Sequence, residues 1–155
     1  MSRADELRAL PRKAISIRQP WAHMILHEGK SVENRSWSTS FRGPVLLHAA
    51  KGMTRDEFWD GMCTLEAISR QDRETNNRRR AQIHQAMQRG GIVGIVDIVD
   101  CVADHPSPWF VGRYGFVLAN PRPLPFVSCR GALGFFDVPD EARAALIARE
   151  AEHGR

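Results

Sequence analysis

Three stretches in the first third of the chain gather side chains that can do chemistry together. Residues 17–21 read IRQPW, residues 29–37 read GKSVENRSW, and residues 42–51 read RGPVLLHAAK. Burying so many charges would cost several kcal/mol for each unless they were paired or used. We therefore expect these side chains to line a pocket: Arg18, Gln19, Trp21, Lys30, Glu33, Asn34, Arg35, Trp37, Arg42, His48 and Lys51.

Lys30 and Glu33 are the candidate catalytic residues. A lysine has an unperturbed pKa of about 10.4, so it acts as a base or nucleophile at neutral pH only where its surroundings disfavour the charge. Arg35 and Lys51 can contribute to that, and Glu33 can pass a proton to a leaving amine. The competing interpretation is a surface ion pair between Glu33 and Arg35. Because Lys30 follows a glycine turn, we expect Lys30→Ala to leave the fold intact.

The other side chains of these stretches can recognise a nucleobase. Trp21 and Trp37 each offer a flat face on which a base can stack, although both can also be core aromatics. Gln19 and Asn34 can form paired hydrogen bonds to a base edge. The candidate substrate-binding residues are Gln19, Trp21, Asn34, Arg35, Trp37, His48, Lys51 and Tyr114, and a purely structural histidine is the alternative for His48.

Length and charge indicate one globular domain with a local basic segment. The chain has 155 residues, is 43% hydrophobic and 26% charged, and carries a formal net charge of +4. Residues 70–89 hold six arginines against two acidic residues, so this segment accounts for the whole excess. Such a segment attracts phosphates, or is only a solvated helix face. The weaker candidates for nucleic-acid contact are Arg42, Arg78, Arg79, Arg80, Ser128 and Arg130.

Missing motifs exclude several classes of protein. The sequence has no phosphate-binding glycine loop, Gly-x-Ser-x-Gly, His-Glu-x-x-His or Cys-x-x-Cys, which removes P-loop hydrolases, elbow-type serine hydrolases and zincins. No apolar run approaches the roughly 20 residues that cross a bilayer, and the first residues lack signal-peptide features. We expect a cytoplasmic monomer without metal, cofactor or membrane partner, in which Cys63, Cys101 and Cys129 are reduced and mostly buried.

The sequence predicts that the candidate residues lie on or between numerous strands that surround a few helices. Apolar periodicity predicts strands at 14–18, 31–37, 45–50, 92–102, 114–119 and 132–138. It predicts helices at 4–10, after Pro20, from Thr54 over three to four turns, at about 77–89 and after Pro139. Residues 71–76 are expected to be a polar loop, and residues 120–126 a proline-rich connector. Without alternating βαβ units, this order indicates a small barrel of the α+β class.

At these motifs the chain resembles the ASCH domain family (activating signal cointegrator homology), a branch of the PUA-like barrels. The similarity covers about residues 14–138. It rests on IRQPWA at 17–22, GK at 29–30, ENR at 33–35 with Trp37, RG at 42–43, HA at 48–49 with Lys51, Gly94, SPWF at 107–110, YG at 114–115, PRPL at 121–124 and CRG at 129–131. It implies one α+β domain over residues 1–155, a small PUA-like β-barrel with a helical insertion at about 54–90 and a C-terminal helix at about 139–153.

The resemblance also implies a function. Members of the family are connected with RNA binding, with cleavage of single-stranded RNA, and with hydrolysis of cytidine acylated on its exocyclic nitrogen. In the amidohydrolase branch the reactive lysine corresponds to Lys30. Glu33 stands where that branch has a hydroxyl residue, and its distant glutamate has no match here.

The expected activity is therefore removal of the acyl group from an N4-acylated cytidine or cytosine of the N4-acetylcytidine type. The alternative is an RNA-binding module, including a single-strand endoribonuclease with its cleft wall near Lys51 and Ser128. The expected partners are a modified cytidine nucleoside or single-stranded RNA.

Overall fold

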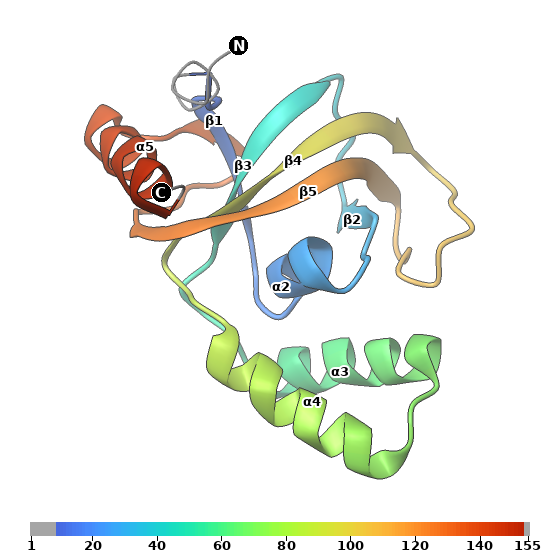
Figure 1. Cartoon of the computed structure of the whole chain (residues 1–155). Helices are drawn as coiled ribbons and strands as arrows, with labels where there is room; N and C mark the ends of the chain where they lie inside the picture. The colour runs from blue at the N-terminus through green and yellow to red at the C-terminus, as the bar shows by residue number, and fades with distance from the viewer. Residues whose placement is uncertain (1–8, 154–155) are drawn as a thin grey trace.

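The computed structural model describes residues 9–153, which form one curled six-stranded sheet and four helices (Figure 1). In chain order these are β1 (Lys13–Ile17), α2 (Trp21–His27), β2 (Val32–Arg35), β3 (Gly43–Ala49), α3 (Arg55–Ser69), α4 (Arg73–Ala86), β4 (Gly91–Val102), β5 (Tyr114–Ser128), β6 (Phe135–Asp137) and α5 (Asp140–His153). The strand order is β2-β5-β4-β3-β1-β6, in which only β1 and β3 are parallel neighbours. The predicted α+β class is confirmed, and most of the helix predicted at 4–10 lies outside the described residues.

The sheet curls into a half-barrel around an apolar core. β4 and β5 are 12 and 15 residues long, and their pairing shifts register at three places. Bulges of this kind bend a strand and increase its twist. Trp37, which follows β2, packs edge-on against Phe116 and Phe135 with ring centroids 5.2 and 5.8 Å away. This aromatic contact brings the β2 side of the sheet against β6. Of the two roles considered for Trp37, base stacking and core packing, its contacts support core packing.

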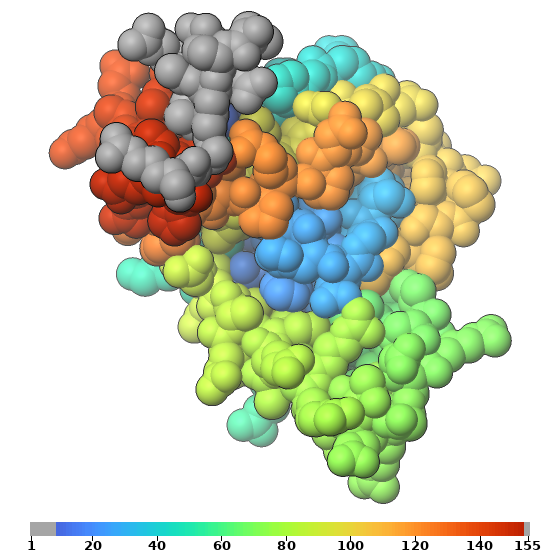
Figure 2. Space-filling model, viewed as in Figure 1, coloured from blue at the N-terminus to red at the C-terminus, as the bar shows by residue number. Residues whose placement is uncertain are grey.

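Helix α2 lies between the sheet and the α3–α4 hairpin (Figure 1). It begins directly after Pro20, buries Ala22, Met24 and Ile25, and is followed by Gly29 at a φ of +74°. Glycine adopts that conformation without the penalty that a side chain would bring. In the space-filling view, the blue surface of α2 and its following turn is seen between β5 in orange and the hairpin in green (Figure 2).

The α3–α4 hairpin is the predicted insertion between β3 and β4. Thr54 caps α3, its hydroxyl accepting from the Glu57 N–H while the Glu57 carboxylate accepts from the Thr54 N–H. A Cβ at Gly61 would lie 2.4 Å from Cγ of Pro20, so only glycine lets α3 approach the start of α2 this closely. The predicted loop over 71–76 is wrong, because Asp72 caps α4 and the helix starts at Arg73.

The prediction of a proline-rich connector over residues 120–126 is also wrong, since β5 continues through this segment to Ser128. Pro121, Pro123 and Pro125 are two residues apart, so their missing N–H groups belong to one edge of the strand. β2 pairs with β5 only over residues 114–117, which leaves that edge uncovered at the prolines. Proline is tolerated in a strand at such an edge.

The helices and the three cysteines were also the subject of predictions from the sequence. Within residues 9–153, no helix has the length and apolar character needed to cross a membrane. The three cysteines are free thiols as predicted, but none is buried: Cys63 is exposed, and Cys101 and Cys129 are half-buried.

His23 on α2 makes the stability of the fold depend on pH. Burial, followed by the nearby His27 ring at 4.7 Å, lowers the pKa of His23 from 6.5 to about 4. The unfolded chain therefore binds the proton more readily, and the free energy of unfolding should fall by about 2–3 kcal/mol as pH drops from 6.5 to 4. Urea unfolding of the wild type and His23→Gln across this range checks the effect. The variant should lose most of this pH dependence, and identical curves would contradict the assignment.

Candidate functional site

A cavity of about 270 Å³, here named the Lys30 cavity, brings together several candidate residues from distant segments. Helix α2, the turn after it, β2, α3 and the loop before β5 all contribute to it. Its lining residues are Trp21, Lys30, Glu33, Asn34, Thr64, Pro108, Trp109 and Val111. Its polar side chains and its two tryptophans are suited to a planar, hydrogen-bonding ligand.

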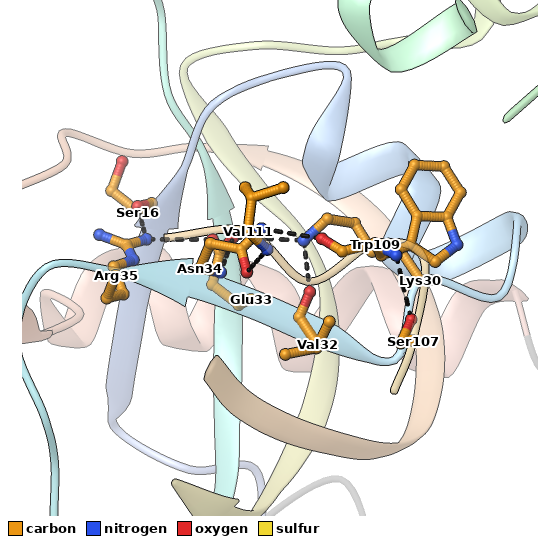
Figure 3. Close-up of polar contacts among 9 residues, drawn as sticks. All are labelled: Ser16, Lys30, Val32, Glu33, Asn34, Arg35, Ser107, Trp109 and Val111. Carbon is orange, nitrogen blue, oxygen red and sulfur yellow. Dashed lines mark hydrogen bonds and ion pairs between the residues drawn. The ribbon is translucent and has the colours of Figure 1, made fainter. Parts of the chain in front are cut away.

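Lys30 is buried at this cavity, with a side chain that is only 2% exposed. Its Nζ donates to the carbonyl of Val32 and lies 3.4 Å from Oε1 of Glu33 (Figure 3). The same Nζ is 6.0 Å from the ring centroid of Trp21. The backbone N–H of Lys30 donates to the Met24 carbonyl at 3.0 Å, and this bond holds the turn after α2 against the helix. The expectation that Lys30 adds little to packing is therefore wrong, and Lys30→Ala would leave a hole.

Glu33 is shared by two cations. Its Oε1 faces Lys30, while Oε2 accepts from Arg35 at 3.2 Å. Both side chains of the Lys30–Glu33 pair are buried and that of Arg35 is 21% exposed, so the interpretation as a surface ion pair is wrong. When Lys30 is protonated, the single negative charge of Glu33 therefore balances only one of the two positive charges on Lys30 and Arg35.

The pKa of Lys30 is lowered at this site. Burial is the main cause, Arg35 acts in the same direction, and Glu33 opposes both. Desolvation disfavours the charged amine, and the second cation is left without a carboxylate of its own. Arg35 contributes as predicted, whereas Lys51 lines a different cavity. The buried amine of Lys30 therefore loses its proton more readily than that of an exposed lysine.

Asn34 and Arg35 hold the surroundings of the cavity in place (Figure 3). The Asn34 amide donates to the Trp109 carbonyl at 2.9 Å and accepts from the Val111 N–H at 3.0 Å. Arg35 donates to the carbonyl of Ser16 at 2.8 Å and so connects β2 with β1. Both side chains are used within the fold, and their predicted contact with substrate stays a prediction.

Gln19 does not line the Lys30 cavity. Its buried side chain donates to the Gln88 carbonyl at 3.0 Å and accepts from the His23 N–H at 2.9 Å. These bonds tie the start of α2 to the segment after α4. Base recognition by Gln19 is thus not supported by its position.

Four residues that line the Lys30 cavity were not among the sequence candidates: Thr64, Pro108, Trp109 and Val111. Thr64 comes from α3, and its hydroxyl donates to the Asp60 carbonyl at 3.0 Å. Trp109 is 5% exposed and packs beside α2 and α3, while Val111 is 64% exposed at the rim. The tryptophan in a proline-bearing loop was a usable signal for an aromatic wall, whereas nothing local distinguishes Thr64.

A second and larger hollow, here named the basic cavity, has a volume of about 650 Å³. It lies where β3 and β5 end and β4 begins. Its lining residues are Ser16, His48, Ala50, Lys51, Arg89, Gly90, Ser128, Cys129, Arg130 and Gly131. Three of these are cations and none is a carboxylate, so the cavity is suited to an anion.

His48 lines the basic cavity as a neutral ring. Its Nε2 lies 2.7 Å from the Cys129 carbonyl, which only accepts, so Nε2 carries the proton and Nδ1 accepts from the Ser16 hydroxyl at 3.0 Å. Burial lowers its pKa. A Cβ at Gly131 would lie 2.6 Å from the ring, so glycine permits this contact. These bonds support the structural alternative for His48.

The remaining candidates are scattered. Tyr114 is opposite Arg35 in the β2–β5 ladder. Arg42 lies 3.6 Å from Asp100. On α4, Arg78 is exposed, Arg79 is paired with Glu28, and Arg80 is paired with Glu66 and stacked 4.2 Å from the Trp59 ring. The arginine-rich segment is thus partly neutralised inside the fold. Across residues 9–153, no group of three or more His, Cys, Asp or Glu residues is arranged to hold a metal ion.

Comparison with known proteins decides the family. The family model of the ASCH domain matches residues 15–110, which include the β-strands and turn around Lys30. The chain belongs to the ASCH domain family. The structure accordingly gives a small PUA-like ASCH domain. The matched stretch ends before β5, so the resemblance of the later motifs stays a prediction.

Two relatives of this ASCH domain are similar over 90 residues. Human Activating signal cointegrator 1 is 31% identical, and its mouse counterpart is 30% identical. The aligned stretch is 57% of this chain and 14% of each relative. Most of each relative therefore lies outside the similarity.

Proposed function

We propose that this ASCH domain hydrolyses the amide of an N4-acylated cytidine or cytosine in the Lys30 cavity. The observation that supports this most is a buried lysine that shares one carboxylate with an arginine, beside two tryptophans. A poised base, an acid and aromatic walls are the parts that amide hydrolysis on a nucleobase needs.

The proposed reaction adds one water across the amide bond. The cytosine ring lies against Trp21 and Trp109, and the neutral amine of Lys30 takes a proton from water while the water oxygen bonds to the acyl carbon. Lys30 passes this proton to Oε1 of Glu33, which lies 3.4 Å away. As the C–N bond breaks, Glu33 delivers the same proton to the exocyclic nitrogen that leaves. The products are a carboxylic acid and free cytidine, after which Lys30 is again neutral.

Incubation with N4-acetylcytidine tests the proposal directly. Chromatography should show cytidine and acetate appearing in equal amounts, and Lys30→Met should produce neither. Methionine is the better control than alanine, because it fills the buried space. If purified wild type releases no more cytidine than Lys30→Met, the amidohydrolase proposal is overturned.

The basic cavity favours a second candidate function, the binding of single-stranded RNA. Lys51, Arg89 and Arg130 surround it without a carboxylate, and Ser128 adds a hydroxyl. Neutralising phosphates releases counterions, which makes such binding depend on salt. This candidate also includes a ribonuclease, which differs from simple binding only by the appearance of cut RNA.

The salt dependence of RNA binding separates this candidate from nucleoside turnover. With three phosphates neutralised, affinity for a short single strand should fall roughly 10- to 20-fold between about 50 and 200 mM salt. Arg89→Gln and Arg130→Gln should each flatten the slope by about 0.7. Arg78→Gln, on the exposed face of α4, is the matched control and should leave the slope unchanged. Equal effects of all three variants would place the RNA elsewhere.

A further inference from the structure

A third cavity, of about 180 Å³, adjoins Lys30 and is almost entirely apolar. We name it the apolar cavity. Its lining residues are Ile25, Gly29, Lys30, Ser31, Val96, Leu118 and Pro121. Ile25 and Val96 are each 1% exposed and Leu118 is 9% exposed, so the walls are part of the packed core. Such a space suits a small hydrocarbon group.

The apolar cavity is adjacent to the Lys30 cavity, because the two cavities share Lys30 and are both lined by α2 and by the segment that follows it. Along α2, Trp21 lines the Lys30 cavity and Ile25, one helical turn or about 5–6 Å further, lines the apolar cavity. In the segment after α2, Glu33 lines the Lys30 cavity. Ser31, two residues earlier or about 6–7 Å along an extended chain, lines the apolar cavity. Lys30 lines both. The two cavities thus adjoin at Lys30.

We propose that the apolar cavity binds the acyl chain of the substrate, so that the enzyme prefers chains longer than acetyl. This inference rests on the proposed amidohydrolase function. An apolar cavity of about 150 Å³ in an engineered protein holds benzene, so this one accommodates a chain of about four to six carbons or a phenyl ring. The ring of the substrate occupies the Lys30 cavity, and the amide between ring and chain lies at the Lys30 amine.

A series of N4-acylcytidines tests the inference. Burying one methylene group is worth about a fourfold gain in kcat/KM. We therefore expect N4-butanoylcytidine to be hydrolysed at least about tenfold more efficiently than N4-acetylcytidine. Equal or falling kcat/KM from acetyl to butanoyl would overturn the acyl site and leave the amidohydrolase proposal standing.

Filling the cavity should remove the preference. Leu118→Phe places extra carbon atoms in the apolar cavity and should lower the butanoyl-to-acetyl ratio of kcat/KM by about tenfold. Leu124→Phe is the matched control, since Leu124 is a buried leucine of the same strand at 7% exposure and lies outside the cavity. If Leu118→Phe does not fold, Pro121→Phe at the exposed rim should have the same effect on the ratio. An unchanged ratio in the folded variants would overturn the inference.

Binding of N4-alkylcytidines separates this inference from the proposed function, because these compounds have no acyl bond to cleave. Isothermal titration should show N4-butylcytidine binding about tenfold or more tightly than N4-methylcytidine, and Leu118→Phe should abolish the difference. This result without hydrolysis of any acylcytidine would support the apolar site and overturn the proposed reaction. Hydrolysis with chain-independent binding would overturn the acyl site alone, and the absence of both would overturn both.

Discussion

Replacing Lys30 with methionine is expected to lower kcat/KM for N4-acetylcytidine by about 10³-fold or more. A positioned general base contributes roughly 10² to 10⁴ in rate, and methionine fills the space of the lysine stem but cannot accept a proton. Lys30→Arg should fail almost as badly, because a guanidinium stays protonated at neutral pH. Steady-state kinetics, with cytidine release followed by chromatography, measures both variants.

Lys13→Met is the control for the Lys30 variants. Lys13 is an exposed lysine on β1 that pairs with Asp137 at 2.9 Å and lines none of the three named cavities. Its replacement should leave kcat/KM within about twofold of wild type, since surface pairs contribute little. Amidase activity at wild-type level in Lys30→Arg would rule out a catalytic lysine.

Glu33→Gln should destabilise the fold far more than Lys30→Met. Glutamine in place of Glu33 leaves Lys30 and Arg35 without a carboxylate, and breaking a buried pair in this way costs about 3–5 kcal/mol. Methionine in place of Lys30 leaves Glu33 and Arg35 paired, so the free energy of unfolding should change by less than about 1.5 kcal/mol. Urea denaturation of each variant measures the difference.

The double variant shows whether charge balance is the reason. In Glu33→Gln combined with Lys30→Met, only Arg35 remains charged, and it is the most exposed of the three. The double variant should therefore be more stable than Glu33→Gln alone, with a coupling energy of about 1–3 kcal/mol. A double variant that loses the sum of both single effects would show that the three charges do not form one unit.

Local sequence signals predicted the elements whose boundaries depend on nearby residues. Thr54 and Glu57 form their capping box within four residues, and Gly29 ends a helix by its own conformation. The start of α4 was missed because Asp72 caps it within a polar stretch that carries no apolar periodicity. β5 was predicted to end at residue 119 because prolines usually end strands. The strand tolerates them here because β2 stops pairing before they are reached.

The site was predicted in part for the same reason. Lys30, Glu33 and Asn34 are neighbours in the sequence, so their common location followed from the strand. The burial of Lys30 depends on α2 folding over the turn, and the wall residues Thr64 and Trp109 arrive from α3 and a later loop. Contacts at this separation in the chain leave no local pattern that a single sequence displays.

The pKa of Lys30 is the most direct test of the central claim that this amine is the base. Nuclear magnetic resonance of lysine labelled at the side-chain nitrogen, with Lys30→Met used to assign the signal, measures it in the folded protein. We predict a pKa below the ordinary value of about 10.4. We also predict that kcat/KM for N4-acetylcytidine rises with pH through that same pKa, because the amine must lose its proton first. A Lys30 pKa at or above about 10.4, or a pH profile that does not follow it, would contradict the account.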